Sequence, residues 1–153
     1  DEVLAELDFV IASLHTGLSQ GREQATRRVL NAIENPHVDM IAHPTGRLLP
    51  DRAGADLDMD AVLAAAAATG TILEINAHPA RLDLRDTHVR RAVELGVRIA
   101  INTDAHRPEE FDNRGYGVAT AQRGWATAAD VVNTWPLEEF LTFIQSKGSR
   151  QAA

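Results

Sequence analysis

Histidine and carboxylate side chains follow several apolar segments of this chain. His15 ends the segment DFVIASLH, His43 ends VDMIAH, and Asp104 and His106 end VRIAINTDAH. Imidazole nitrogen and carboxylate oxygen together suit Zn, Mn or Fe better than Ca or Mg. A carboxylate among them can bridge two metals at the roughly 3.5–4 Å separation of binuclear hydrolytic sites. These four residues are candidate metal ligands, and Asp104 and His106 are also candidate catalytic residues.

Each of these residues has a simpler alternative reading. Asp104 and His106 can be a helix cap and a surface histidine, and single histidines such as His15 and His43 are often ordinary core or loop residues. The two histidines, however, hold matching positions after apolar runs, and TDAH follows another such run. This repetition favours the interpretation as ligands.

A second group of polar residues surrounds the third apolar segment. Glu74 and Asn76 alternate along TILEIN, so their side chains share one face of a strand. A buried carboxylate there needs a partner or a metal, and a purely structural pairing stays open. His78 and Arg81 follow in NAHPARLDL, where Arg81 offers a bidentate fork for a phosphodiester oxygen or, alternatively, a salt bridge within the loop. These four residues are candidate substrate-binding groups.

The segment GYGVATAQRGW has two interpretations. Gly115 and Gly117 indicate a turn, and Tyr116, Arg123 and Trp125 then form either a stacking patch for nucleic acid or the packed aromatic end of a helix. We favour the packing interpretation.

The apolar segments alternate with helical patterns. Strands are expected in 8–15, 38–43, 71–76 and 97–102, and helices in 22–35, after a cap at Asp58, after a cap at Asp86 and from Pro136 onward. Trp135, Phe140 and Phe143 are expected to dock the last helix. Such alternation favours a parallel sheet covered by helices, in which the carboxyl ends of all strands open on one face. The candidate residues are therefore expected to converge.

Composition limits the alternatives. With 153 residues the chain is too short for a complete eight-unit barrel of about 250 residues. It has no cysteine, so disulfides and thiolate ligands are excluded. We expect a cytoplasmic protein with no membrane partner, because neither a basic leader nor an apolar run of about 18 residues is present. The formal charge of -7 disfavours a domain that mainly grips a nucleic-acid backbone.

Five motifs give the chain a recognisable similarity. SLH, IAHPTGRLL, EINAHPARLDL, TDAH and GVATAQRGW followed by VVNTWP resemble the PHP (polymerase and histidinol phosphatase) domain of bacterial family X DNA polymerases. The resemblance implies a partial, distorted (β/α)7 TIM-like barrel with about four βα units present. Residues 1–153 would be the C-terminal part of a single PHP domain, cut from a longer protein that also contains polymerase modules.

The resemblance also implies an activity. PHP domains hold up to three Mn or Zn ions, and His15, His43, Asp104 and His106 match four of the family's metal positions. For the polymerase-linked branch this implies a manganese-dependent 3'-5' exonuclease that acts on DNA in repair. The other family ligands belong to upstream motifs, so we expect the fragment alone to be inactive. A histidinol-phosphatase-like monoesterase and a non-catalytic platform for the polymerase modules are the alternatives.

Overall fold

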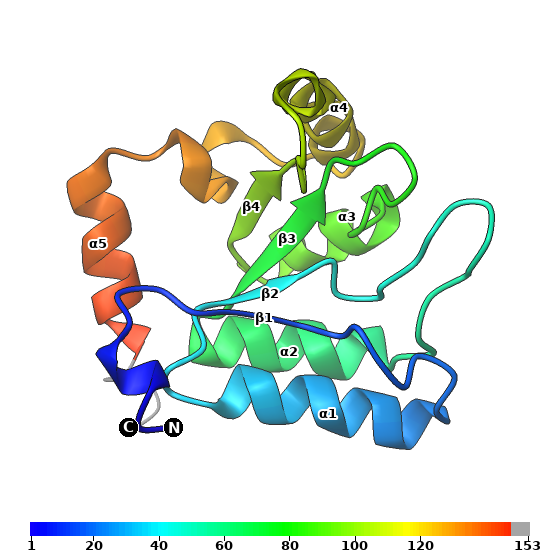
Figure 1. Ribbon diagram of the computed structural model, residues 1–153. Helices are drawn as coiled ribbons and strands as arrows, with labels where there is room; N and C mark the ends of the chain where they lie inside the picture. The colour runs from blue at the N-terminus through cyan, green and yellow to red at the C-terminus, as the bar shows by residue number, and fades with distance from the viewer. Residues whose placement is uncertain (148–153) are drawn as a thin grey trace.

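One parallel β-sheet forms the centre of the chain (Figure 1). The computed structural model describes residues 1–147. The strands, hydrogen-bonded in the order β1-β2-β3-β4, are β1 (Ile11–Ser13), β2 (Met40–Ala42), β3 (Ile72–Asn76) and β4 (Ile99–Asn102). The α-helices are α1 (Arg22–Glu34), α2 (Met59–Thr69), α3 (Asp86–Glu94), α4 (Arg114–Arg123) and α5 (Leu137–Gln145). The 3-10 helices are η1 (Leu4–Glu6), η2 (Pro108–Asn113), η3 (Ala128–Asp130) and η4 (Val132–Thr134). The predicted alternation of strand and helix is confirmed.

The main core lies between the sheet and the helices α1, α2 and α3. Apolar side chains at helical spacing meet alternate side chains of the strands there. Its fully buried members include Ile33, Leu63, Leu73, Ile75 and Val89. Because this face of the sheet is closed by helices, the polar side chains of the strands must point to the other face.

The first strand differs from its prediction. The segment DFVIASLH was expected to be a buried strand, but β1 has three residues and Ile11 is 52% exposed. β1 pairs only with β2 and is an edge of the sheet, so one of its sides has no neighbouring strand.

The predicted helix ends are confirmed for α2 and corrected for α3. The Asp58 carboxylate accepts a hydrogen bond from the Ala61 N–H at 3.1 Å, and Gly70 closes α2 in the left-handed region with φ 75°. Asp86 is the first residue of α3 and does not cap it; its carboxylate binds Arg123 of α4 at 2.8 Å instead. Asp86 therefore ties two helices together.

The turn predicted around Gly115 and Gly117 is wrong, because both residues lie inside helix α4. A Cβ atom at Gly117 would stand 2.5 Å from Ile101 Cγ2 and 2.8 Å from Ala77 Cβ. The glycine lets α4 approach the ends of β3 and β4 closely, so it serves packing and not a turn.

The second face of the sheet is covered at its amino end by η4 and α5. Met40, Ile72 and Ala100 point to this side and pack against a cluster of aromatic side chains. The Trp135 and Phe143 rings have centroids 5.4 Å apart, and those of Phe9 and Phe140 are 5.6 Å apart. The prediction that Trp135, Phe140 and Phe143 dock the last helix is confirmed.

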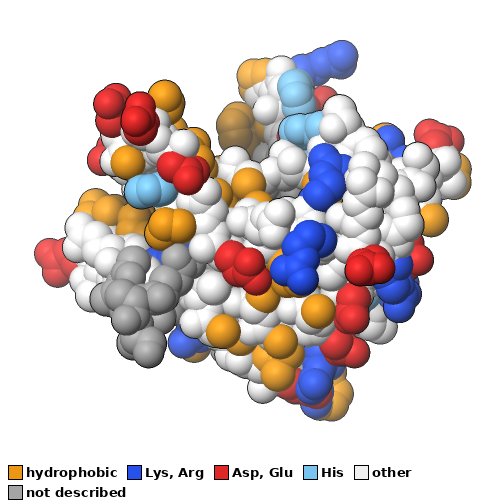
Figure 2. Space-filling view, turned by 90° about the horizontal axis from the view of Figure 1, so that it is seen from below, with side chains coloured by type: hydrophobic (Ala, Val, Ile, Leu, Met, Phe, Trp, Pro, Cys, Tyr) orange, Lys and Arg blue, Asp and Glu red, His pale blue; other side chains and the backbone are white. Residues whose placement is uncertain are grey.

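The described sheet is open, with β1 and β4 at its ends. Val131 adds a single parallel bridge to Ile99, beyond β4. The α/β class with four βα units is confirmed, and a closed barrel stays a prediction. No helix within residues 1–147 is long and apolar enough to cross a membrane. Figure 2 shows acidic, basic and apolar side chains mixed on the face seen from below.

Candidate functional site

His43 stands at the carboxyl end of β2 in an unusual environment. Its φ of 30° is in the left-handed region, which a residue other than glycine adopts only when its surroundings hold it there. The side chain is 5% exposed, and its Nδ1 atom is buried without a hydrogen-bond partner. Burial, assisted by the charge of Arg81, lowers the pKa of His43. A neutral imidazole with an unused ring nitrogen is the form that binds a metal.

Glu74 links the ends of three strands. Its carboxylate is 4% exposed and accepts hydrogen bonds from the His43 N–H at 2.6 Å, from Asn102 Nδ2 at 2.9 Å and from Asn76 Nδ2 at 3.4 Å. Burial raises the pKa of Glu74, although these donors oppose the rise. The predicted shared face of Glu74 and Asn76 is confirmed.

Asp104 joins the same network from the end of β4. It has a φ of 55°, and its Oδ2 atom accepts hydrogen bonds from Asn76 Nδ2 and from Arg81 Nε, both at 3.2 Å. The side chains of Arg81 and Asp104 are 18% and 33% exposed. Hydrogen bonds therefore connect His43, Glu74, Asn76 and Asp104 across β2, β3 and β4, as the convergence argument predicts.

The other two candidate ligands lie differently. The His15 and His43 rings have centroids 5.1 Å apart, so β1 and β2 bring their histidines together. His15 is exposed, and its Nδ1 lies 3.3 Å from Ser13 Oγ. The exposed ring of His106 turns back to its own loop, with Nδ1 2.7 Å from the Asp104 carbonyl oxygen.

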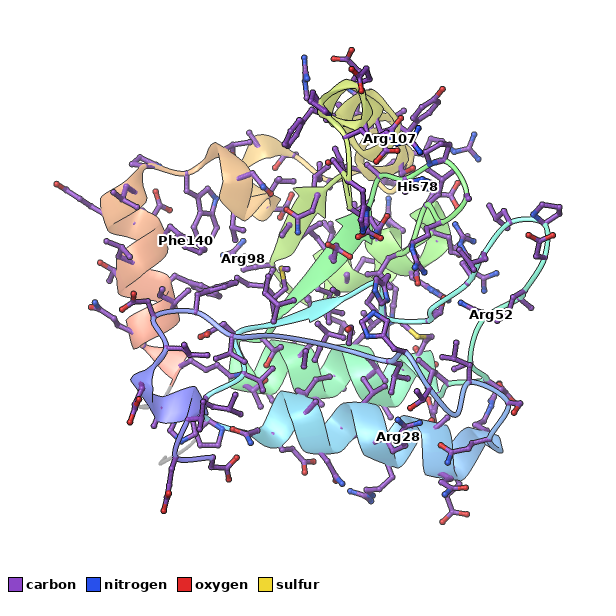
Figure 3. The ribbon with its side chains drawn as sticks, viewed as in Figure 1. Arg28, Arg52, His78, Arg98, Arg107 and Phe140 are labelled. Carbon is purple, nitrogen blue, oxygen red and sulfur yellow. The ribbon has the colours of Figure 1, made fainter. Side chains whose placement is uncertain are left out.

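The candidate substrate-binding residues line the same edge. His78 Nδ1 accepts a hydrogen bond from the Ala80 N–H at 3.2 Å, and the Arg81 guanidinium holds Asp104 as described. In Figure 3, His78 and Arg107 lie at the carboxyl end of the sheet below α4, whereas Phe140 lies toward the opposite end. The carboxyl edge thus combines carboxylate, imidazole and guanidinium groups.

Two residues of this region have no counterpart in the sequence-based candidates. Asn102 donates to Glu74, and only its position at the end of an apolar strand could have indicated this. Asp83 is fully buried, and its Oδ2 accepts hydrogen bonds from the Thr45 N–H, the Thr45 hydroxyl and the Gly46 N–H at 2.9–3.0 Å. The Asp83 side chain therefore connects the loop after β2, which carries His43, to the loop after β3.

The donor set fits part of a metal centre. His43 supplies an unused buried nitrogen, His15 a second imidazole beside it, and Asp104 a carboxylate whose Oδ1 has no hydrogen bond in the described chain. No group of three or more His, Asp or Glu side chains within residues 1–147 lies close enough to hold an ion. The four candidate residues therefore remain predicted ligands.

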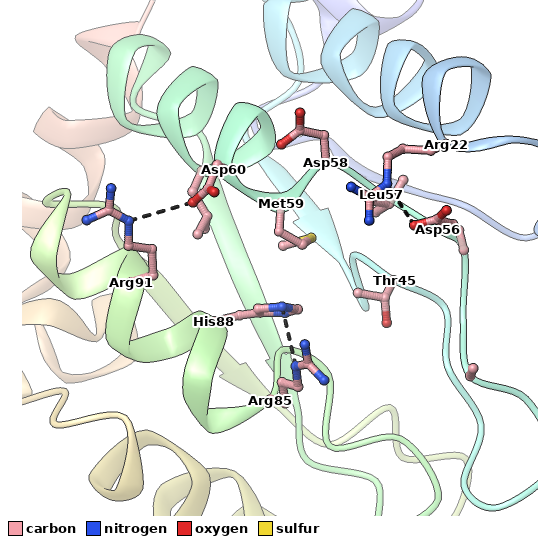
Figure 4. Close-up of a pocket in the computed structure, with 13 residues that line it drawn as sticks. Arg22, Thr45, Asp56, Leu57, Asp58, Met59, Asp60, Arg85, His88 and Arg91 are labelled. Carbon is pink, nitrogen blue, oxygen red and sulfur yellow. Dashed lines mark hydrogen bonds and ion pairs between the residues drawn. The ribbon is translucent and has the colours of Figure 1, made fainter.

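A separate hollow of about 470 Å³ lies near the start of α2 and beside α3 (Figure 4). Its ion pairs join Arg22 to Asp56 at 2.9 Å and Arg91 to Asp60 at 3.7 Å. The His88 ring also lines it, with Nδ1 buried and unpartnered. None of the four candidate ligands lines this hollow, so it is separate from the candidate site.

Comparisons with known proteins show which sequences the chain is similar to. Over 145 residues, 95% of this chain, it is 46% identical to the DNA polymerase/3'-5' exonuclease PolX of Bacillus subtilis (strain 168). It is 36% identical over 115 residues, 69% of the chain, to the probable phosphatase TTE1963 of Caldanaerobacter subterraneus subsp. tengcongensis. The chain spans 25% of the length of the first relative and 43% of the second. No model of a known family matches it.

These relatives define the class. The chain belongs to the PHP family. Within that family it corresponds to the PHP domain of a bacterial family X DNA polymerase, and the resemblance drawn from the five motifs is confirmed.

Proposed function

We propose that the chain is the C-terminal part of a metal-dependent 3'-5' exonuclease domain in a family X DNA polymerase that acts in DNA repair. The observation that carries the proposal is the buried network from His43 through Glu74 and Asn76 to Asp104, at the strand ends where such folds bind ligands. The similarity to a polymerase that is also named an exonuclease supports the choice of reaction.

Manganese or zinc would be held by His15, His43, Asp104 and His106, with up to three ions once residues 1–153 are joined to the remainder of a distorted seven-stranded barrel. Such ions polarise phosphoryl oxygens and lower the pKa of bound water. The His106 ring, which now faces its own loop, would have to turn away from the Asp104 carbonyl oxygen to bind.

The remaining residues of the network act around the ligands. Glu74 fixes the backbone of His43, and Asn76 fixes the carboxylate of Asp104. Arg81 and His78 would bind a phosphodiester oxygen, with Arg81 exchanging its contact with Asp104 for that anion. DNA and polymerase modules in the same polypeptide are the proposed partners, in the cytoplasm.

The test is Mn²⁺-dependent removal of 3'-terminal nucleotides from a primer-template by the natural full-length protein and its Asp104→Ala variant. We expect the variant to lose at least about a hundredfold in rate, because one metal ligand is removed. Equal rates in the two proteins would contradict the proposal and favour a structural platform for the polymerase modules.

A second candidate reaction is monoester hydrolysis of the histidinol phosphatase kind. The similarity to several probable phosphatases favours it. Release of phosphate from histidinol phosphate, with DNA ends left intact and the same dependence on Asp104, would support this reaction over the exonuclease.

A further inference from the structure

A second hollow lies beside the candidate site, and two of its residues, Tyr116 and Arg123, belong to the segment for which the sequence left a nucleic-acid stacking patch open. It has a volume of about 390 Å³, within the range of small-ligand pockets. Arg47 from the loop after β2, Arg85 and Asp86 from the start of α3, and Tyr116 and Arg123 from α4 line it. We call it the arginine hollow. Its residues come from the loops and helices that follow β2, β3 and β4.

The arginine hollow carries an excess of positive charge. The Arg123 guanidinium is neutralised by Asp86 at 2.8 Å. Arg47 donates to the backbone carbonyl oxygens of Arg81 and Leu82, and Arg47 has no carboxylate partner within residues 1–147. The charges of Asp83 and Asp86 act on Arg47, but neither carboxylate forms an ion pair with it, so the guanidinium keeps charge that an anion can meet.

Arg85 is the second available cation. It is exposed, and its Nε donates to His88 Nε2 at 3.3 Å (Figure 4). Burial lowers the pKa of His88 to about 4, so this partner is neutral near pH 7. In a chain of net charge -7, two guanidinium groups without a carboxylate partner in one hollow favour binding of an anion there.

Tyr116 gives the hollow an aromatic surface. The side chain is 53% exposed, although the sequence favoured packing for this residue. The packing interpretation is also wrong for Trp125, which is 68% exposed and has the Arg90 guanidinium 3.5 Å from its ring centroid. An exposed aromatic ring beside arginines is the combination with which proteins hold single-stranded nucleic acid.

Direct contacts connect the arginine hollow to the candidate site. The Arg47 carbonyl oxygen accepts a hydrogen bond from Arg81 NH1 at 3.5 Å, and Arg81 Nε holds Asp104 at 3.2 Å. We propose that the arginine hollow binds the single-stranded end of the DNA substrate, with Tyr116 stacked on a base and Arg47 and Arg85 on phosphates. The inference rests on the proposed function, since it names how that site would hold its substrate.

The test uses the natural full-length protein in the presence of EDTA, so that no strand is hydrolysed. An oligothymidylate carrying 5-iodouracil near its 3' end is irradiated on the protein, and the cross-linked peptide is mapped. We expect the cross-link at Tyr116, retained in Tyr116→Phe and Asp104→Ala. In Arg85→Gln its yield at low oligonucleotide concentration should fall about fivefold or more.

The matched control is Arg27→Gln, which removes the same charge from an exposed position on α1. Its cross-link yield should equal that of the wild type. Cross-links that map away from α4, or an Arg85→Gln yield equal to that of Arg27→Gln, would overturn the inference even if Mn²⁺-dependent hydrolysis is present. If the cross-link maps to Tyr116 but the protein shows no Mn²⁺-dependent hydrolysis of DNA, DNA binding in the arginine hollow would be supported and the proposed exonuclease reaction rejected.

Discussion

At the scale of residues, Glu74 is the centre of the candidate site. Each of its carboxylate oxygens accepts a hydrogen bond, and Asn102, Asn76 and the His43 N–H are all donors. A carboxylate matches three donors because it only accepts. This position therefore requires a carboxylate. The amide of glutamine has the same shape, but its NH2 group would face N–H donors.

We predict that Glu74→Gln lowers the free energy of unfolding by about 1–3 kcal/mol, because its NH2 group would face N–H donors in a buried site. Urea denaturation measures the change. The control is Glu94→Gln on the surface of α3, where loss of the exposed pairs with Arg90 and Arg91 should leave the free energy of unfolding nearly unchanged. Equal costs for the two variants would show that the network contributes nothing.

His88 predicts a pH dependence of stability. Burial first, then the charges of Arg85 and Arg47, lower its pKa to about 4, while Asp60 opposes this. The unfolded chain, with a histidine pKa of about 6.5, binds the proton more tightly in this range. The stabilisation is therefore complete above about pH 6.5 and is lost as the pH falls toward about 4.

We expect the wild type to lose about 1–2 kcal/mol relative to His88→Gln between about pH 7 and pH 5, a value reduced by the partial exposure of the ring. Denaturation curves of both proteins at several pH values give this difference. Taking the difference removes the opposite contributions of Asp39, Glu74 and Asp83, whose pKa values burial raises. If the free energy of unfolding changes with pH in the same way in both proteins, His88 does not cause the predicted pH dependence.

Residue types and strand ends were sufficient to predict which side chains gather at the site. His43, Glu74, Asn76 and Asp104 all follow or end apolar runs, and the structure joins them. Their partners were harder to predict, because Asn102 opposite Asn76 depends on the register of β3 and β4. The direction of the His106 ring depends on loop dihedral angles that no spacing encodes.

At the scale of elements, helix α4 depends on one close contact. Glycine is a poor helix former, so two glycines in GYG indicated a turn. Tertiary contact overrides this preference: at Gly117 the helix lies against Ile101 and Ala77, where no side chain fits. The missing methyl group is therefore a requirement of packing.

We predict that Gly117→Ala destabilises the protein by about 1–3 kcal/mol, because the added methyl group would overlap the ends of β3 and β4. Gly115→Ala is the matched control in the same helix. Nothing lies within 4 Å of its added Cβ atom, so stability should be unchanged or rise by up to about 1 kcal/mol. Thermal unfolding of the two variants measures both changes in stability. A Gly117→Ala variant more stable than the wild type would contradict the close contact at Gly117.

At the scale of the whole molecule, the four described strands form an open sheet whose two faces are covered differently. The helical face is closed, whereas within residues 1–147 the face that carries Glu74, Asn76 and Asn102 is covered at its amino end alone, by η4 and α5. An apolar hollow of about 360 Å³ lined by residues such as Phe9, Met40 and Trp135 remains on that side. The alternation of strands and helices was enough to predict the parallel sheet, whereas a closed barrel stays a prediction.

Metal binding is the central claim, and Mn²⁺ bound per natural full-length protein, measured by metal analysis after gel filtration, tests it most directly. We expect the wild type and His88→Gln to retain the metal, and His43→Ala and Asp104→Ala to lose most of it while their circular dichroism is unchanged. Equal metal content in all four proteins, or none in the wild type, would contradict the claim that these strand ends form a metal centre.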